Sequence, residues 1–445
     1  MALLISKNSS LQLTPTTSKD RILIMGYAKE QWIRRTARGY GDVPDKYVCA
    51  DCFEDYSIRE FIKENVVEKE CSYCGRKSKS PIAAELEIVV DFICQGINTE
   101  WEDPARSMAW EGAEGGYQGA RIIDSDDLIR YEIEELENTN EAVLDDIVLS
   151  LIGSHDWCQK DPYGLRKEEA LSLSWADFAE QVKHYTRYVF LELNDEADDF
   201  HLDLDVIPVS KMLSRLSWEI SKMEYDIKMI NVLDIGCTIY RARIHDKGKK
   251  LTTAKKLGTV TVKKAKYANR MSPAGIPMFY GSFEADTAFK EIIDISGSRR
   301  GKIVSIASFK TLKKLIILDL CHLPEVPSLF DASSRHLRSS LIFMRHFVEE
   351  FRKPIKKSKL ENIEYIPTQV FTEYIRHIYE DIEGNPIEGI LYPSSRNPGG
   401  ISCVLFIMNE QCVDKNSTRK KTSEEISENA CLFLEEVERR NPYNK

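Results

Sequence analysis

The sequence lacks any long hydrophobic run and any recognisable export signal. Its apolar runs, such as residues 315–318, are far shorter than the ~20 residues that a membrane-spanning helix needs. The first ten residues, MALLISKNSS, include neither a basic n-region nor an adequate apolar h-region. We therefore expect a soluble protein of the cytoplasm with no membrane partner.

The composition also lacks the biases of fibrous and disordered proteins. Of the 445 residues, 42% are hydrophobic and 30% are charged, and there are only 22 Gly and 16 Pro. This balance excludes a collagen-like, low-complexity or wholly disordered chain. At about 150 residues per domain, the length predicts two to four domains.

An excess of basic residues is missing as well. The chain has 61 Lys and Arg against 71 Asp and Glu, a net charge of −10, so nucleic acid is not favoured as a partner. Lysines nevertheless crowd residues 247–266 and acids crowd residues 195–205, which we interpret most simply as two solvated surfaces. The lysine-rich segment keeps open the alternative of a zinc-containing nucleic-acid-binding regulator without catalysis.

The cysteines do not form an even set. There are 11, in a chain without an export signal, so we expect metal ligands and not disulfides. Cys49 and Cys52 form one CxxC and Cys71 and Cys74 form another, with 18 residues between the pairs. This spacing predicts a four-thiolate zinc site, which is closed to water and therefore structural. Gly75 suits the positive φ that such a turn needs.

Hydrophobic spacing divides the rest of the chain. Apolar residues recur at three- and four-residue steps in 175–189 and 209–223, which predicts a helical bundle. Ser174, followed by Asp177, is typical of a capping box and predicts a helix start. We expect five segments: an N-terminal extension (1–40), a zinc-binding module (41–80), a helical domain (81–228), an α+β domain (229–410), and a polar linker with a C-terminal helix (411–445) that carries Leu432, Leu434 and Val437 on one side.

The second half of the chain mixes short β-type runs with short helices. The residue patterns predict strands at 276–282, 303–309, 315–320, 390–392 and 401–407, and helices at 287–293, 343–351 and 368–379, the first capped by Asp286. This alternation is typical of an α+β domain large enough to have its own core.

Several motifs of this half carry a family resemblance. YRAR (240–243), NRMSPAGIPMFYGS (269–282), TAFKEI (287–292), EYIPTQVFTEYIR (364–376) and GILYPSSRNPGG (389–400) resemble, in order, the RES domain. Upstream, the double CxxC and the SHDWCQKDPY…SWADF segment resemble the HEPN/RES N-terminal domain. HEPN RNases place a His four to six residues after an Arg, and His155, His184 and His201 lack that Arg. We therefore expect no RNase site.

The resemblance implies a fold class and an activity. The fold class is α+β, with the zinc-binding segment and helical bundle followed by a mixed α/β domain similar to ADP-ribosyltransferases. The family cleaves the nicotinamide–ribose bond of NAD+, with water or phosphate as acceptor; the alternative is a protein ADP-ribosyltransferase. It also implies a toxin or antiviral defence effector with an antitoxin or activating protein as partner. We further expect a homo-oligomer.

The chemistry of that reaction can be matched to residues. An oxocarbenium-like transition state needs a carboxylate beside the ribose, and a pyrophosphate needs cations, for which the fork of Arg is well suited. By motif, the resemblance assigns catalysis to Glu291, Arg241, Tyr280 and Ser394, and NAD+ binding to Arg243, Asn269, Arg270, Ser282 and Arg396. Ser395 stays open as an alternative to Ser394.

Each assignment has a simpler structural alternative. Arg241 could be a surface ion-pair partner, Tyr280 a core aromatic, Glu291 an exposed helical acid, and Ser394 a turn former beside Pro393. The histidines of this half show no spacing typical of a nucleophile and its base. The position of Glu291 relative to Arg241 and Tyr280 therefore decides the hypothesis.

Overall fold

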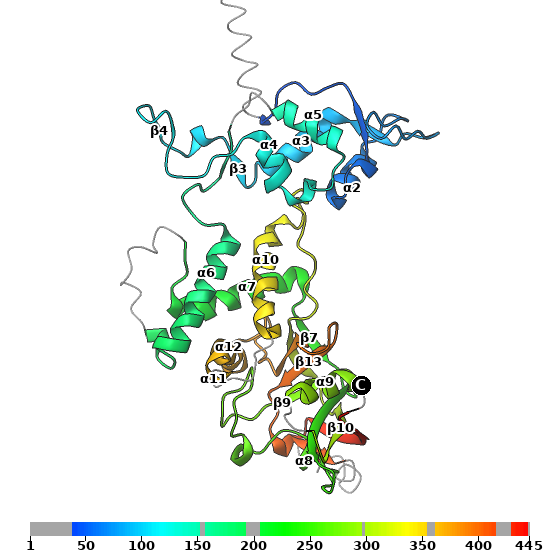
Figure 1. Ribbon diagram of the computed structural model, residues 1–445, viewed down its shortest axis with the longest axis vertical. Helices are drawn as coiled ribbons and strands as arrows, with labels where there is room; N and C mark the ends of the chain where they lie inside the picture. Colours follow the sequence, from blue (N-terminus) through cyan, green and yellow to red (C-terminus); the bar gives the residue numbers. More distant parts are fainter. Residues whose placement is uncertain are drawn as a thin grey trace, which may run out of the picture. The chain divides into compact units, whose positions relative to one another are not determined.

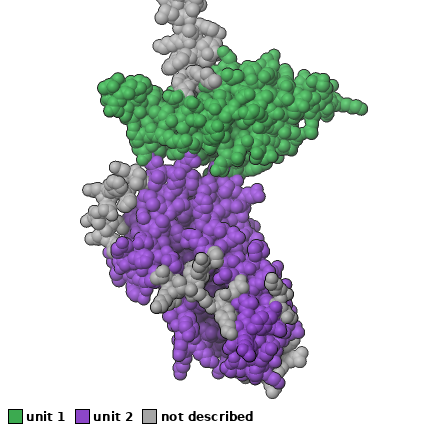
Figure 2. Space-filling view, in the orientation of Figure 1, with its two compact units in different colours: residues 1–163, 327–336 green, residues 164–326, 337–445 purple. Residues whose placement is uncertain are grey.

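The computed structural model describes residues 38–151, 156–192, 205–295, 299–353, 361–414 and 429–443. The chain forms two compact units, which Figure 2 distinguishes by colour. The first unit comprises residues 1–163 together with 327–336, and the second comprises residues 164–326 together with 337–445.

The first unit combines short strand pairs with helices (Figure 1). Its helices are α2 (Tyr56–Glu64), α3 (Leu86–Ile97), α4 (Ser125–Asp127) and α5 (Glu141–Leu151). Its antiparallel pairs are β1 (Tyr47–Cys49) with β2 (Ala83–Glu85), β3 (Trp101–Glu102) with β6 (Cys158–Gln159), and β4 (Trp110–Glu111) with β5 (Gly116–Tyr117). Helix α2 begins after Asp55, whose carboxylate accepts hydrogen bonds from the backbone N of Ser57 (3.0 Å) and Ile58 (2.9 Å).

The core of the first unit forms around α3. This helix buries Leu86, Val89, Val90, Ile93 and Ile97, which share one face because residues three and four apart lie side by side on a helix.

A segment distant in sequence completes this core. Leu329 and Phe330, from 327–336, are buried in it. The Phe330 ring lies so close to Gly96 that a Cβ there would stand 2.4 Å from it. A glycine in the last turn of α3 is therefore needed for this packing.

The second unit is built on a nine-stranded sheet. Its strand order is β14-β15-β10-β8-β9-β13-β12-β11-β7, and only the β11–β12 and β14–β15 pairs are parallel. The strands are β7 (Ile230–Leu233), β8 (Thr238–Asp246), β9 (Phe279–Ser282), β10 (Lys302–Thr311), β11 (Leu315–Asp319), β12 (Gly389–Pro393), β13 (Ile401–Leu405), β14 (Cys412–Asp414) and β15 (Leu432–Arg440).

Helices accompany this sheet. They are α6 (Lys167–Glu180), α7 (Met212–Ile227), α8 (Ala254–Leu257), α9 (Ala285–Ile295), α10 (Arg338–Arg352), α11 (Glu361–Glu364) and α12 (Ile366–His377). The ring centre of Phe347 on α10 lies 4.8 Å from that of Trp175 on α6 and 5.0 Å from that of Phe371 on α12, and both pairs are edge to face. This aromatic cluster joins the three helices in one core.

The α+β fold class is confirmed, but the predicted C-terminal helix is wrong. Residues 432–440 form β15, which pairs with β10. A register shift beside Ser308 forms a bulge in which Glu435 is not paired with any residue of β10 in the strand register. One side of the strand therefore carries Leu432, Leu434 and then Val437. This spacing of two and then three residues resembles a helical stripe, which explains the error.

Two predictions about the helical part also need correction. Ser174 does not start a helix, because α6 begins at Lys167 and the Ser174 Oγ donates to the carbonyl of Ala170 (2.6 Å). The helix expected to be capped by Asp286 already begins at Ala285.

The predicted helical domain, 81–228, is divided between the units, because the boundary falls after residue 163. Residues 1–37 of the predicted extension, His155, His201 and residues 195–204 of the acidic stretch lie outside the described residues.

Candidate active site

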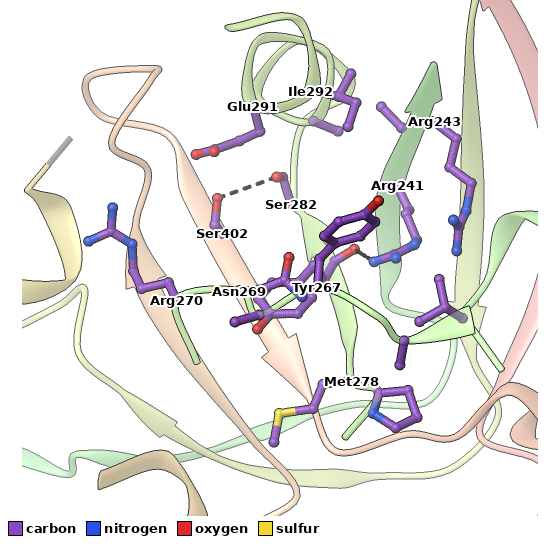
Figure 3. Close-up of a pocket in the computed structure, with 18 of the residues that line it drawn as sticks. Arg241, Arg243, Tyr267, Asn269, Arg270, Met278, Ser282, Glu291, Ile292 and Ser402 are labelled. Atoms are coloured by element: carbon purple, nitrogen blue, oxygen red, sulfur yellow. Dashed lines mark hydrogen bonds between the residues drawn. The ribbon is translucent and has the colours of Figure 1, made fainter. Parts of the chain in front are cut away.

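A cavity of about 800 Å³ opens in the second unit. Its lining comes from β8, from the segment between α8 and β9, from β9 and α9, and from β12 with the residues that follow it; Tyr365 before α12 and Ser402 on β13 complete it. Figure 3 shows Glu291 and Ile292 on α9, Arg241 and Arg243 on a single strand, and Arg270 on a separate segment. The strands β8, β9, β13 and β12 are neighbours in the sheet. For this reason, residues more than 150 positions apart in sequence line the same cavity.

Glu291 reaches this cavity from α9 and is half-buried there. Its Oε1 accepts a hydrogen bond of 2.5 Å from the Oγ of Ser394, a buried residue just after β12. The Ser394 Oγ in turn accepts from the backbone N of Arg396 (3.2 Å) and Asn397 (3.1 Å). Ser394 thus orients the carboxylate, whereas Ser395 lines the cavity itself.

Arg241, on β8, presents an unsatisfied donor. Its Nη1 donates to the carbonyl of Tyr280, and its guanidinium lies 5.1 Å from the ring centre of Phe279. Its Nε is buried and has no hydrogen-bond partner among the described residues. Burial lowers the pKa of Arg241 below its usual value. A buried guanidinium with a free N–H is costly unless a ligand pairs with it, so this group is suited to an anion.

Arg243 lies two residues further along the same strand. Its Nε donates to the carbonyl of Leu257 (3.2 Å) and its Nη2 to that of Gly258. Burial, together with the positive charge of Arg241, lowers the pKa of Arg243 to about 9. The positively charged side chains of Arg241 and Arg243 thus donate to backbone carbonyls and not to carboxylates.

Arg270 is anchored at the end of a helix. Its Nη1 donates to the carbonyl of Glu350 (3.0 Å) and its Nη2 to that of Lys353 (2.6 Å), at the C-terminal end of α10. Carbonyls at a helix C-terminus carry partial negative charge, which holds a cation there. This anchoring leaves only part of the guanidinium for a ligand.

Tyrosines line the cavity as well. The Tyr280 hydroxyl lies 2.9 Å from the Oγ of Ser272, and burial raises the pKa of Tyr280 to about 12. Burial, reinforced by the charge of Glu291, raises the pKa of Tyr392 well above its usual value. Both phenols are therefore neutral at pH 7. Tyr267 differs, because its ring is 83% exposed and still lines the cavity.

The lining is strongly cationic. It includes Arg241, Arg243, Lys264, Lys266, Arg270 and Arg396, and among the described lining residues Glu291 is the only carboxylate. Across the described ranges, none of these six cations has a carboxylate within ion-pairing distance. Unpaired cations around one carboxylate suit a ligand with several negative charges and one developing positive charge.

The structure brings most of the predicted site residues together. Arg241, Arg243, Asn269, Arg270, Tyr280, Ser282, Glu291 and Arg396 line the cavity, and Ser394 joins them through Glu291. Sequence analysis missed the roles of Tyr267, Tyr392, Lys264 and Lys266 at the cavity, although the lysines lie in the cluster noted there. Ser282 lies opposite Ser402, with 3.4 Å between their hydroxyl oxygens.

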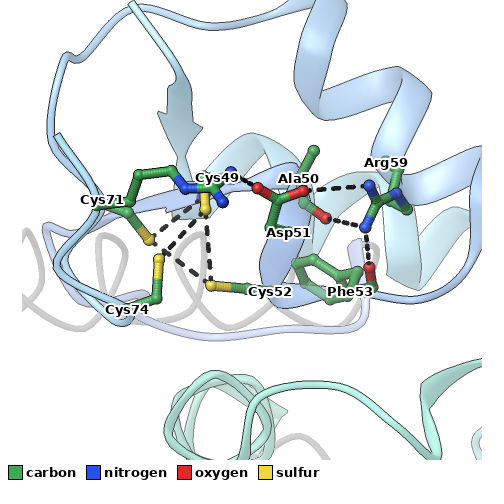
Figure 4. Close-up of polar contacts among 9 residues, drawn as sticks. Cys49, Ala50, Asp51, Cys52, Phe53, Arg59, Cys71 and Cys74 are labelled. Carbon is green, nitrogen blue, oxygen red and sulfur yellow. Dashed lines mark hydrogen bonds and ion pairs between the residues drawn. The ribbon is translucent and has the colours of Figure 1, made fainter. Parts of the chain in front are cut away.

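A separate cluster in the first unit joins the four cysteines of the CxxC pairs. Figure 4 shows the sulfurs of Cys49, Cys52, Cys71 and Cys74 turned toward one another, and all four lie within 4.8 Å. Neighbouring sulfurs are 3.5 Å (Cys49–Cys74), 3.6 Å (Cys52–Cys71) and 3.9 Å (Cys49–Cys52) apart. Zn–S bonds of about 2.3 Å in a tetrahedron place sulfurs roughly 3.8 Å apart, so the cluster fits a metal ion of this type.

The surroundings of this cluster support metal binding. Burial raises the pKa of Cys49 to about 12 and also raises that of Cys52. At Cys71, burial is outweighed by hydrogen bonds from backbone N–H groups, which lower the pKa to about 7 and so favour the thiolate form at this residue. Gly75 has a φ of +69°, as expected for such a turn. Arg59 holds the first CxxC by donating to the carbonyls of Ala50 (3.2 Å) and Phe53 (2.9 Å).

Two family models match the chain. Residues 64–196 match the HEPN/RES N-terminal domain 1, and residues 238–425 match the RES domain. These matches confirm the resemblance found in the sequence. No curated protein and no solved structure matches the chain. None of the described helices is long and apolar enough to cross a membrane.

Proposed function

We propose that the RES domain of this chain cleaves the nicotinamide–ribose bond of NAD+, as a toxin or defence effector. The RES match supports an enzyme that acts on NAD. One observation carries the finer proposal. Among the described lining residues, Glu291 is the only carboxylate, it is oriented by Ser394, and six cations without carboxylate partners surround it.

The charges of NAD+ match this lining. Its pyrophosphate carries two negative charges, for which the buried Nε of Arg241 is a ready donor. Arg243 and Arg396 add positive potential, and Arg270 contributes the part of its guanidinium that α10 does not hold. Tyr267 offers an exposed ring on which a base can stack.

The proposed reaction requires little proton transfer. When the bond between the ribose C1′ and the pyridinium nitrogen breaks, its electron pair passes to nicotinamide, which leaves as a neutral molecule. The positive charge then moves to the ribose, where the carboxylate of Glu291 stabilises the oxocarbenium-like transition state. Water adds to C1′ and releases a proton, which gives ADP-ribose. The neutral Tyr280 and Tyr392 supply apolar ring surface for nicotinamide.

Product analysis tests the proposal and identifies the acceptor. Purified protein is incubated with NAD+ labelled in the adenylate, with and without phosphate, and nicotinamide is measured by chromatography. We expect nicotinamide release, with ADP-ribose as product if water is the acceptor and ADP-ribose 1″-phosphate if phosphate is. Label on protein instead would identify an ADP-ribosyltransferase. Absence of nicotinamide release under all conditions contradicts the proposal.

We also propose that the ion of the Cys49–Cys74 cluster is zinc. The four thiolates leave no open position for water, so the ion would stabilise the first unit and take no part in catalysis. An antitoxin or activating protein remains a prediction from the family resemblance. Self-association of the chain remains a prediction from the helical bundle. The nucleic-acid-binding alternative combines the zinc-binding segment and the helical bundle with the lysines of 247–266, of which Lys264 and Lys266 line the cavity.

A further inference from the structure

We propose that Asn397 is a positioning residue for catalysis: it clamps residues 394–400, the Ser394 loop, onto α9, so that the Ser394 hydroxyl holds the Glu291 carboxylate in place. This inference rests on the proposed role of Glu291. Asn397 itself is absent from the described lining of the cavity, so it would act through Ser394 and Glu291 and not on the substrate.

The side chain of Asn397 uses both of its ends on α9. Its Nδ2 donates to the Oγ1 of Thr287 (2.6 Å), and its Oδ1 accepts from the Nζ of Lys290 (2.7 Å). Thr287 is four residues before Glu291, so the two side chains lie on the same face of the helix. Asn397 therefore contacts α9 one helical turn before Glu291, the carboxylate whose position it fixes.

The backbone of Asn397 completes the hydroxyl geometry of Ser394. A serine hydroxyl has one hydrogen to donate and two lone pairs to accept. The Ser394 Oγ accepts from the backbone N of Arg396 (3.2 Å) and of Asn397 (3.1 Å), which fills both lone pairs. Its single hydrogen is then directed to the Oε1 of Glu291. The backbone also closes the loop, through Ser394 N to the carbonyl of Gly400 (2.8 Å) and Gly400 N to the carbonyl of Asn397 (2.8 Å). Without the side-chain contacts to α9, this loop could shift as a unit relative to Glu291, and the Ser394 hydroxyl would shift with it.

The Ser394 loop packs against α9 at the limit of steric tolerance. A Cβ added at Gly400 would lie 2.6 Å from the Oγ1 of Thr287 and 2.8 Å from the Nδ2 of Asn397. The Thr287 Oγ1 donates its own hydrogen to the carboxylate of Glu284 (2.9 Å), so it is available as an acceptor for Asn397. These contacts fit one arrangement of donors, which fixes the orientation of the Asn397 amide.

Kinetics of Asn397→Ala test this inference. A misplacement of about 1 Å in a catalytic group costs up to about 100-fold in rate, so we expect kcat to fall about 10- to 100-fold. KM for NAD+ should change much less than kcat, because Arg241, Arg243 and Arg270 lie outside the Ser394 loop and only Arg396 belongs to it. Thr287→Val removes the hydroxyl that accepts from Asn397 but keeps the shape of this buried side chain, so it should also lower kcat more than it changes KM. This variant tests the inference if Asn397→Ala does not fold.

A double variant separates positioning from a general loss of structure. If Asn397 acts only through Ser394, Asn397→Ala combined with Ser394→Ala should be no slower than Ser394→Ala alone. Asn385→Ala is the matched control. Asn385 is another half-buried loop residue, whose Nδ2 donates to the Oδ2 of Asp381 (3.0 Å), and it does not line the cavity. It should leave kcat unchanged.

Hydrogen–deuterium exchange without NAD+ makes the test independent of activity. In Asn397→Ala, the backbone amides of residues 394–397, 399 and 400 should exchange faster than in the wild type; Pro398 has no amide hydrogen. If the wild type releases no nicotinamide but this exchange increases, the proposed function fails and the clamp stands. Unchanged exchange, unchanged kcat, or effects that multiply with those of Ser394→Ala each overturn the inference.

Discussion

Replacement of Glu291 by Gln is the most direct test of the proposed chemistry. The amide keeps the shape of the carboxylate and can still accept a hydrogen bond from Ser394, so the fold and the loop should be preserved. What is lost is one negative charge in a half-buried position of the cavity. The effect on rate therefore reports the electrostatic contribution of the carboxylate to the transition state.

The magnitude follows from the surroundings of this charge. For unit charges about 4 Å apart, an effective dielectric constant of about 20 gives an interaction of about 4 kcal/mol. At about 1.4 kcal/mol per tenfold change, the loss corresponds to a roughly thousandfold lower kcat. Binding of the pyrophosphate should be unaffected or tighter, because removal of Glu291 leaves a lining of six cations and no carboxylate.

The assay follows nicotinamide release over time, and calorimetry measures the affinity for ADP-ribose. Glu410→Gln is the matched control, because this exposed acid belongs to the same unit and does not line the cavity. It should leave both quantities unchanged. If Glu291→Gln kept more than about a tenth of the wild-type rate, stabilisation of the ribose cation by this carboxylate would be refuted.

Three further predictions concern other parts of the molecule. Arg241→Lys keeps the charge but loses the unsatisfied Nε, so KM for NAD+ should rise about 10-fold or more in steady-state kinetics; an unchanged KM would exclude contact with the pyrophosphate. Tyr267→Ala should raise KM about 10-fold for NAD+ but not for nicotinamide mononucleotide, which lacks the second base; equal effects on both would contradict stacking on adenine. Cys71→Ser should lose zinc by elemental analysis and melt at lower temperature, whereas Cys94→Ala, outside the cluster, should keep its zinc; retention of zinc by Cys71→Ser would refute the site.

The predictions from sequence succeeded best where one local pattern decides the structure. The apolar segments around Leu315–Asp319 and Ile401–Leu405 are strands in the interior of the sheet, where both faces are covered. The error at Leu432–Arg440 has the opposite origin. The bulge that changes the spacing of its apolar residues forms only when this segment pairs with β10. The residues of the segment do not by themselves indicate which strand it pairs with.

The sequence by itself determined the four-cysteine cluster and the family. Each CxxC brings two sulfurs together within one turn, and the family motifs are contiguous, so neither depends on knowledge of the fold. Only the tertiary structure decided that Ser394 and not Ser395 contacts Glu291, and that Asn397 grips α9. Residues more than 100 positions apart make these contacts, and the order of strands in the sheet, which local sequence does not encode, brings them within hydrogen-bonding distance.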